Sequence, residues 1–186
     1  MLVRALLVLC LTAPAAARAG DTLTYLAFAT GVESVRTEFP IGTRVQDGTQ
    51  WRLELGQVRS PTTSLGLSAS FTSGGMRQPD VTDLALALRL YPWAGATFVR
   101  ASLGVSSVGM VTHTTQPTDA YVTWTYRGPG LGLGAGLQLG GKSGLAVTGQ
   151  VEVVGRLLAA RDGGAWAVPA TRWSASAGAW LGVEWY

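Results

Sequence analysis

The sequence predicts an all-β fold, an eight-stranded antiparallel up-and-down barrel. Three observations support this prediction: apolar and polar residues alternate strictly in many segments, short and long connections alternate along the chain, and charges are confined to one of the two faces. Strict alternation indicates strands because successive Cβ atoms point to opposite faces of a sheet. The chain has 186 residues, of which 47% are hydrophobic and 13% charged, which excludes a disordered protein and favours one domain.

The N-terminal segment has the three parts of a secretory signal. A short positive region is followed by an apolar stretch at 5–12 and by Ala17-Arg18-Ala19, an A-x-A cleavage site. The apolar stretch is too short for a membrane-spanning helix, which needs about 20 residues. We therefore expect a signal peptide at 1–19 and one barrel domain at 20–186. The single cysteine, Cys10, lies in the signal segment, so the mature domain offers no cysteine nucleophile or thiolate ligand.

The charge composition excludes a nucleic-acid-binding protein. The net charge is +3, but two of the 14 basic residues, Arg4 and Arg18, precede the cleavage site and leave 12 basic against 11 acidic residues. Lys142 is the only lysine, and no basic cluster is present.

Eight segments are predicted as strands. Seven of them alternate clearly, at 51–56, 64–72, 83–91, 99–106, 131–139, 145–153 and 173–185. The first, 22–30, is apolar on both faces, so the sequence does not fix which of its side chains point outward.

The connections alternate in length. Three are short and rich in turn residues, at 60–63, 92–96 and 140–144, whereas four are longer or more polar, at 37–49, 73–80, 112–129 and 158–171. This alternation is typical of outer-membrane barrels, which have short periplasmic turns and longer external loops.

The two faces of the strands predict lipid outside and a polar lumen inside. In strands two to eight the apolar face carries no charge between its rims, while the charged residues, Asp83 and Arg156 among them, share the opposite face with Gly, Ser and Thr. Strands of about 9–13 residues are long enough to cross a bilayer when tilted. Aromatic residues lie near strand ends, where such barrels carry aromatic girdles: Trp51, Tyr91, Trp93, Phe98, Trp173, Trp185 and Tyr186.

With these features the mature region resembles the small eight-stranded outer-membrane barrels of the OmpA transmembrane-domain and OmpX type. The final amphipathic strand resembles the signal that the barrel-assembly machinery recognises. The family usually ends on an aromatic residue that points outward, whereas here Trp185 has the outward register and Tyr186 follows it by one residue. The resemblance implies a monomer in the cell outer membrane, in contact with outer-membrane lipid and lipopolysaccharide and with the assembly machinery during biogenesis.

The candidate site is an ion-pair network inside the barrel. Its members point inward by alternation: Arg52, Glu54, Arg89, Arg100, Glu152 and Glu184. Arg89 and Arg100 flank one tight turn and should lie side by side. Eight strands leave an interior that side chains just fill. We therefore expect a salt-bridged plug rather than an ion-pair gate, and a wide aqueous pore is excluded.

No catalytic constellation is evident, so we expect a structural or surface-contact protein without catalytic, cofactor or metal sites. His113, the only histidine, falls in the 112–129 connection, and no serine lies between Ser107 and Ser143. Two alternatives stay open. One is a lipid A-modifying barrel enzyme, of acyltransferase or deacylase type, and the other is a soluble exported lipocalin-like barrel with an apolar ligand inside.

Overall fold

The computed structural model describes residues 23–39, 42–73, 80–92, 95–113, 121–140, 144–162 and 171–186. The predicted signal segment, 1–19, lies outside the described residues. In the described part of the chain no helix is long and apolar enough to cross a membrane.

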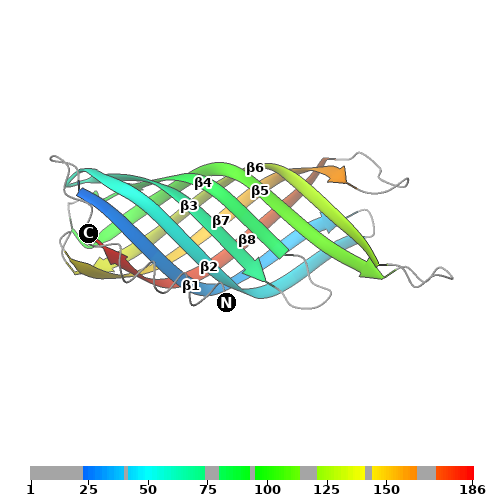
Figure 1. Cartoon of the computed structure of the whole chain (residues 1–186), viewed down its shortest axis with the longest axis horizontal. Coiled ribbons are helices and arrows are strands. Elements are labelled where there is room, and N and C mark those ends of the chain that lie inside the picture. Colours follow the sequence, from blue (N-terminus) through cyan, green and yellow to red (C-terminus); the bar gives the residue numbers. More distant parts are fainter. Residues whose placement is uncertain are drawn as a thin grey trace.

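Eight antiparallel strands close into one barrel in chain order, so that β1 pairs with both β2 and β8 (Figure 1). The predicted fold class is confirmed. The strands are β1 (Leu23–Phe39), β2 (Gly42–Ser60), β3 (Thr63–Ser73), β4 (Asp80–Leu90), β5 (Thr97–His113), β6 (Tyr121–Leu139), β7 (Leu145–Asp162) and β8 (Thr171–Trp185).

The pairing register makes the strands strongly tilted. A row of paired residues that leaves β6 at Leu139 crosses the other seven strands and returns to β6 at Pro129, ten residues away along the same strand. A stagger of this kind requires the strands of a closed barrel to tilt by about 35–45° from its axis. Figure 1 shows this tilt along the whole barrel.

The predicted faces of strands two to eight are confirmed. Leu67 and Leu86 point outward and are 51% and 60% exposed, while Ser68 and Glu54 point inward and are buried. The structure also fixes the first strand, in which odd-numbered side chains such as Tyr25 point inward.

The three short connections occur where the sequence predicted them, between β2 and β3, β4 and β5, and β6 and β7. In the third of these, Gly140 and Gly144 have φ angles of 115° and 93°. Only glycine adopts such a conformation readily, because it lacks a Cβ atom. These three turns mark one end of the barrel, which we call the turn end.

The predicted bounds of three long connections are wrong. Most of 37–49 and of 112–129 is strand, because β1 extends to Phe39, β2 starts at Gly42 and β6 starts at Tyr121. Of 158–171 only the two ends are strand, since β7 ends at Asp162 and β8 starts at Thr171. Only 73–80, between the 11-residue strands β3 and β4, matches its prediction. The remaining strands have 15–19 residues and are longer than predicted. They are also longer than the roughly 9–11 residues that a tilted strand needs to cross a bilayer. They therefore project beyond the apolar part of the wall.

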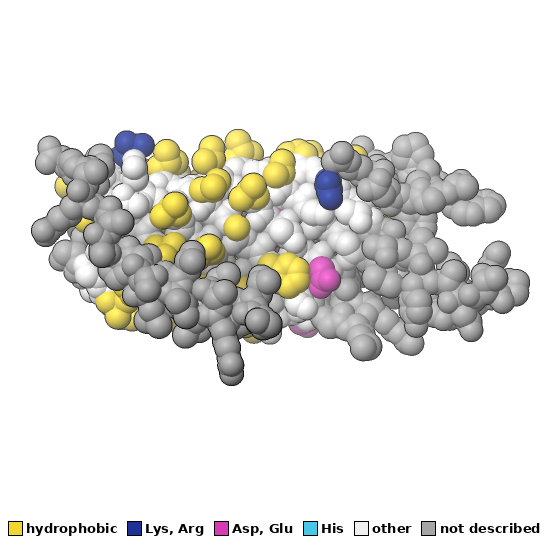
Figure 2. Space-filling model, in the orientation of Figure 1, with side chains coloured by type: hydrophobic (Ala, Val, Ile, Leu, Met, Phe, Trp, Pro, Cys, Tyr) yellow, Lys and Arg dark blue, Asp and Glu magenta, His cyan; other side chains and the backbone are white. Residues whose placement is uncertain are grey.

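The outer surface consequently has two zones. Nearer the turn end is an apolar belt of outward side chains without a charge, including Trp51, Leu55, Leu67, Phe71, Leu86, Leu103, Leu133, Val151 and Leu181. The projecting part, which we call the upper wall, is mostly polar outside, with exposed Ser34, Arg36, Asp47, Thr49, Ser73, Thr82 and Arg127. In Figure 2 hydrophobic side chains cover the left and middle parts of the barrel, and the charged side chains in view lie at the borders of this area.

Candidate functional site

The candidate site fills the lumen at the height of the apolar belt. The six predicted residues come from five strands: β2 contributes Arg52 and Glu54, and the others come from β4, β5, β7 and β8. All six are buried, each with at most 6% of its surface exposed. Their positions follow from the alternation, because each is one residue away from an outward apolar side chain.

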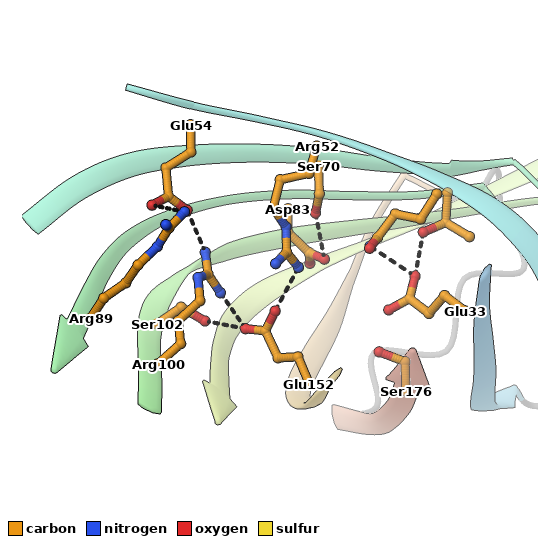
Figure 3. Close-up of polar contacts among 12 residues, drawn as sticks. Glu33, Arg52, Glu54, Ser70, Asp83, Arg89, Arg100, Ser102, Glu152 and Ser176 are labelled. Atoms are coloured by element: carbon orange, nitrogen blue, oxygen red, sulfur yellow. Dashed lines mark hydrogen bonds and ion pairs between the residues drawn. The ribbon is translucent and has the colours of Figure 1, made fainter. Parts of the chain in front are cut away.

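The structure brings these six side chains together in one continuous ion chain, in which arginine and glutamate alternate: Glu184, Arg89, Glu54, Arg100, Glu152 and Arg52. Arg89 Nη2 lies 2.9 Å from Glu54 Oε1, Arg100 Nη2 lies 3.2 Å from Glu54 Oε2, and Arg52 Nη2 lies 2.6 Å from Glu152 Oε2. Arg89 also pairs with Glu184, and Arg100 with Glu152. Figure 3 shows the part of the chain around Glu54 and Glu152.

Uncharged hydroxyl groups donate further hydrogen bonds to the carboxylates of the ion chain. The Tyr25 hydroxyl donates to Glu54 Oε1 at 2.6 Å, and the Ser102 hydroxyl donates to Glu152 Oε1 at 3.0 Å. Three arginines and three glutamates make the chain neutral overall. Buried charges persist only when they are paired and hydrogen-bonded in this way, because desolvation of an isolated ion costs several kcal/mol.

A second cluster lies beside the ion chain, nearer the upper wall. Arg156 donates from Nη2 to Asp83 Oδ2 at 2.7 Å and from Nε to Asp83 Oδ1 at 2.9 Å, and its Nη2 lies 3.4 Å from Glu33 Oε1. Glu33 also accepts hydrogen bonds from Gln50 and Thr72. We call Glu33, Asp83 and Arg156 the Glu33 cluster. Sequence reasoning placed two of its members on the polar face and missed Glu33.

Four aromatic rings close the lumen at the turn end. Tyr25 lies 5.7 Å from Tyr186 and Tyr91 lies 5.6 Å from Phe98, measured between ring centroids. The Arg89 guanidinium lies 5.2 Å from the ring centroids of both Tyr25 and Phe98, within cation–π range. We call Tyr25, Tyr91, Phe98 and Tyr186 the aromatic base.

The aromatic base corrects part of the predicted girdle. Tyr91, Phe98 and Tyr186 point into the barrel rather than outward. The reason is their register, which they share with the inward face of their strands. Trp51 and Trp173 do point outward, and Trp93 lies outside the described residues.

Hydrogen bonds join the aromatic base to the ion chain. The Tyr91 hydroxyl donates to Gln138 Oε1 at 2.8 Å, Gln138 Nε2 donates to the Tyr186 hydroxyl at 2.7 Å, and that hydroxyl donates to Glu184 Oε2 at 2.8 Å. Burial raises the pKa of the Tyr186 phenol, and the neighbouring Glu184 carboxylate raises it further. Tyr186 therefore stays protonated and keeps its role as a donor.

An apolar cap closes the lumen on the other side of the charges, within the upper wall. It consists of the buried side chains Val35, Val81, Val108, Tyr126 and Leu158, which form one contiguous cluster. From the turn end upward the lumen thus contains an aromatic base, the ion chain, the Glu33 cluster and an apolar cap.

Little free volume remains among these layers. The two cavities that border the ion chain have volumes of about 20 Å³ and about 10 Å³. One water molecule needs about 10–15 Å³ on this measure. Among the described residues the lumen at this height is therefore filled by side chains.

The structure leaves one candidate residue undescribed. His113 ends β5 and its backbone pairs with Tyr121, but its side chain lies outside the described residues. Among the described side chains no group of three or more His, Cys, Asp or Glu is arranged to hold a metal ion.

Structural comparison identifies the architecture. The chain matches the crystal structure of Neisserial surface protein A (NspA) with a TM-score of 0.52 and 10% sequence identity, over 87% of this chain and 96% of that one. This chain therefore has the fold of an outer-membrane β-barrel. A second match, the N-terminal β-barrel domain of Pseudomonas aeruginosa OprF, has a TM-score of 0.47 and 12% identity, over 86% of this chain and 97% of that one.

The sequence itself matches no family model and no curated protein. The resemblance expected from the sequence, to small eight-stranded outer-membrane barrels, is confirmed at the level of the fold.

Proposed function

We propose that the chain is exported and inserted into the bacterial outer membrane as a structural or surface-contact barrel without enzymatic activity. The observation that carries this proposal is the apolar belt, whose large side chains are 38–69% exposed with no charge among them. In water so large an apolar surface would drive association, whereas in lipid it is the favourable surface. The charged interior also argues against a lipocalin-like barrel, whose interior would have to be apolar to hold an apolar ligand.

In this proposal the lumen is a plug rather than a pore. Its support is the continuity of the four layers, each of which spans the lumen with buried side chains, and the small size of the cavities that border the ion chain. An eight-stranded barrel has no room for both these side chains and a column of water.

The surface for partners would be the upper wall with the connections at 40–41, 74–79, 114–120 and 163–170. The exposed charged and hydroxyl side chains of the upper wall suit contact with lipopolysaccharide head groups and with the aqueous exterior. Trp185 and Tyr186 would serve the assembly machinery during insertion, and the mature protein would act as a monomer without a cofactor.

Fractionation of expressing cells tests the location. We expect the protein in the outer-membrane fraction, with a mature N-terminus at Gly20 by mass spectrometry. Recovery in the soluble periplasm, or an intact Met1, would contradict the proposal.

Planar bilayer recordings and lipid analysis test the role. The wild type should form no stable channels, and cells that express it should keep their lipid A acyl pattern. Stable wild-type conductance would contradict the plug. An altered acyl pattern that His113→Ala abolishes would favour the lipid A-modifying enzyme instead.

A further inference from the structure

Four buried side chains around the ion chain carry N–H groups that no acceptor satisfies. Among the described residues no hydrogen-bond partner exists for Arg52 Nε and Nη1, Arg89 Nε, Arg100 Nε and Trp180 Nε1. These residues are 6%, 4%, 3% and 2% exposed. Buried polar groups in native proteins nearly always have a partner, which can be an ordered water molecule.

The four residues that carry these donors all line at least one of the two cavities described above. The larger cavity is lined by Arg52, Arg100, Asp83 and the hydroxyl groups of Ser68 and Ser106. The smaller one is lined by Arg52, Arg89, Trp180, Thr148 and Glu184. Arg52 therefore borders both cavities, and its guanidinium also stacks on the Trp180 ring, 4.4 Å from the centroid.

The chemistry of the two cavities defines their ligand. The unsatisfied groups are donors, so the ligand must accept hydrogen bonds. Volumes of about 20 Å³ and about 10 Å³ admit a single small molecule each. The ion chain is already neutral, and the Glu33 cluster next to it has two carboxylates for one guanidinium, so a bound anion would add uncompensated negative charge in a buried site.

We infer that each cavity is a binding site for one ordered water molecule, and that Arg52 separates the two. The water in the smaller site accepts from Trp180 Nε1 and from a free N–H of Arg52 or Arg89. The water in the larger site accepts from Arg100 Nε or Arg52, and can donate to Asp83 or a serine hydroxyl. The charged part of the lumen thus holds water at two isolated points rather than in a continuous file. This inference goes beyond the proposed function and does not depend on it.

Solution NMR of the folded mature barrel in detergent micelles tests the inference. The indole proton of Trp180, assigned by its loss in Trp180→Phe, reports on the smaller site, and the Arg100 Nε proton reports on the larger one. We expect both protons to show direct cross-relaxation with water. Absence of these cross-peaks in the wild type would overturn the inference.

A cavity-filling variant and a change of salt complete the test. Ala29 lines the smaller cavity but not the larger, so Ala29→Val should abolish the Trp180 cross-peak and leave that of Arg100. If both cross-peaks persist in Ala29→Val, with the heat-modifiable migration of the barrel retained, the assigned site is wrong. Replacement of chloride by bromide should leave both proton shifts unchanged. A halide-dependent shift would overturn the assignment to water in favour of an anion.

Discussion

The barrel consists of two regions with opposite polarity. In the apolar belt the outward side chains are hydrophobic, and the lumen behind them holds the ion chain. In the upper wall this order reverses: Ser107 and Arg127 flank inward positions on their strands that are occupied by Val108 and Tyr126 of the apolar cap. At the height of the apolar cap the apolar side chains thus lie inside the barrel, next to the buried polar side chains of Thr37, Gln46 and Ser174. The difference shows that the face that carries apolar side chains can change along one strand.

The largest effect should come from the charged lumen of the belt. Arg100→Ala leaves Glu54 and Glu152 without one of their partners, and should lower the free energy of unfolding by roughly 3–5 kcal/mol if burial is complete. Urea titration of the barrel in lipid vesicles measures this. Arg127→Ala, an exposed arginine of the upper wall, is the matched control and should change stability by about 0.5 kcal/mol or less. If both variants lose the same free energy of unfolding, the ion pairs of Arg100 do not stabilise the barrel more than an exposed arginine does.

The next effect should separate the outer surfaces of the two regions. Leu86→Arg and Leu67→Arg place a charge in the apolar belt and should each cost about 2–4 kcal/mol at mid-membrane depth. Val147→Arg lies two residues from the start of β7 at the turn end and should cost less. Thr82→Arg places the same charge at the upper boundary of the belt, on the strand that holds Leu86 and opposite Phe71 of β3, and should cost less than Leu86→Arg. Heat-modifiability gels and unfolding titrations give the comparison. If Thr82→Arg impairs assembly as strongly as Leu86→Arg, the boundary between the belt and the upper wall lies elsewhere.

A smaller effect should distinguish the two interiors. Val108→Thr keeps the side-chain shape but buries a hydroxyl in the apolar cap, at a cost of about 1–3 kcal/mol if the hydroxyl finds no partner. The reverse exchange, Thr72→Val, removes a donor to Glu33 and should also destabilise the barrel. A stabilising Val108→Thr would show that the cap is wet. A neutral Thr72→Val would show that Glu33 is satisfied without it.

The smallest effect concerns the junction between the aromatic base and the ion chain. Tyr186→Phe keeps the ring but removes the hydroxyl that bonds Gln138 and Glu184, so we expect a loss of about 1 kcal/mol without impaired insertion. Thermal unfolding of the purified barrel and the yield of heat-modifiable protein measure the two effects separately. Reduced yield with unchanged stability would assign the hydroxyl to assembly instead.

Much of the belt could be predicted from the sequence because one rule applies to both of its faces. Most outward Leu and Val residues of the belt alternate with small or charged residues, so Arg52, Arg89 and Glu152 fall on one face by counting alone. The structure places these side chains within ion-pair distance of partners on other strands, which counting along one strand cannot reveal.

The upper wall was harder to predict because the inward residues of the apolar cap alternate with polar outward residues, whereas other inward positions at this height, such as Thr37 and Gln46, are themselves polar. Around Tyr126 the polar outward side chains, together with the Gly-Pro-Gly run at 128–130, resemble a loop, yet Pro129 lies in β6 opposite Val105. Glu33 was missed for a related reason: in β1 both faces carry apolar residues near the turn end, so its register is fixed only by pairing with β2 and β8. Trp180 is a further exception: it lies in a strand with a clear alternation, yet its large apolar ring points into the lumen.

The ion pairs have a mechanical consequence. Backbone hydrogen bonds connect each strand only to its two neighbours, so by themselves they allow a tube to flatten. Every lumen ion pair described above joins strands that are not neighbours: Arg89–Glu184 connects β4 to β8 on the opposite wall, and Arg156–Asp83 connects β7 to β4. These pairs fix the distance between opposite walls. The charged interior thus makes the cross-section stiff, and in the proposed membrane location it would keep the barrel round under lateral pressure.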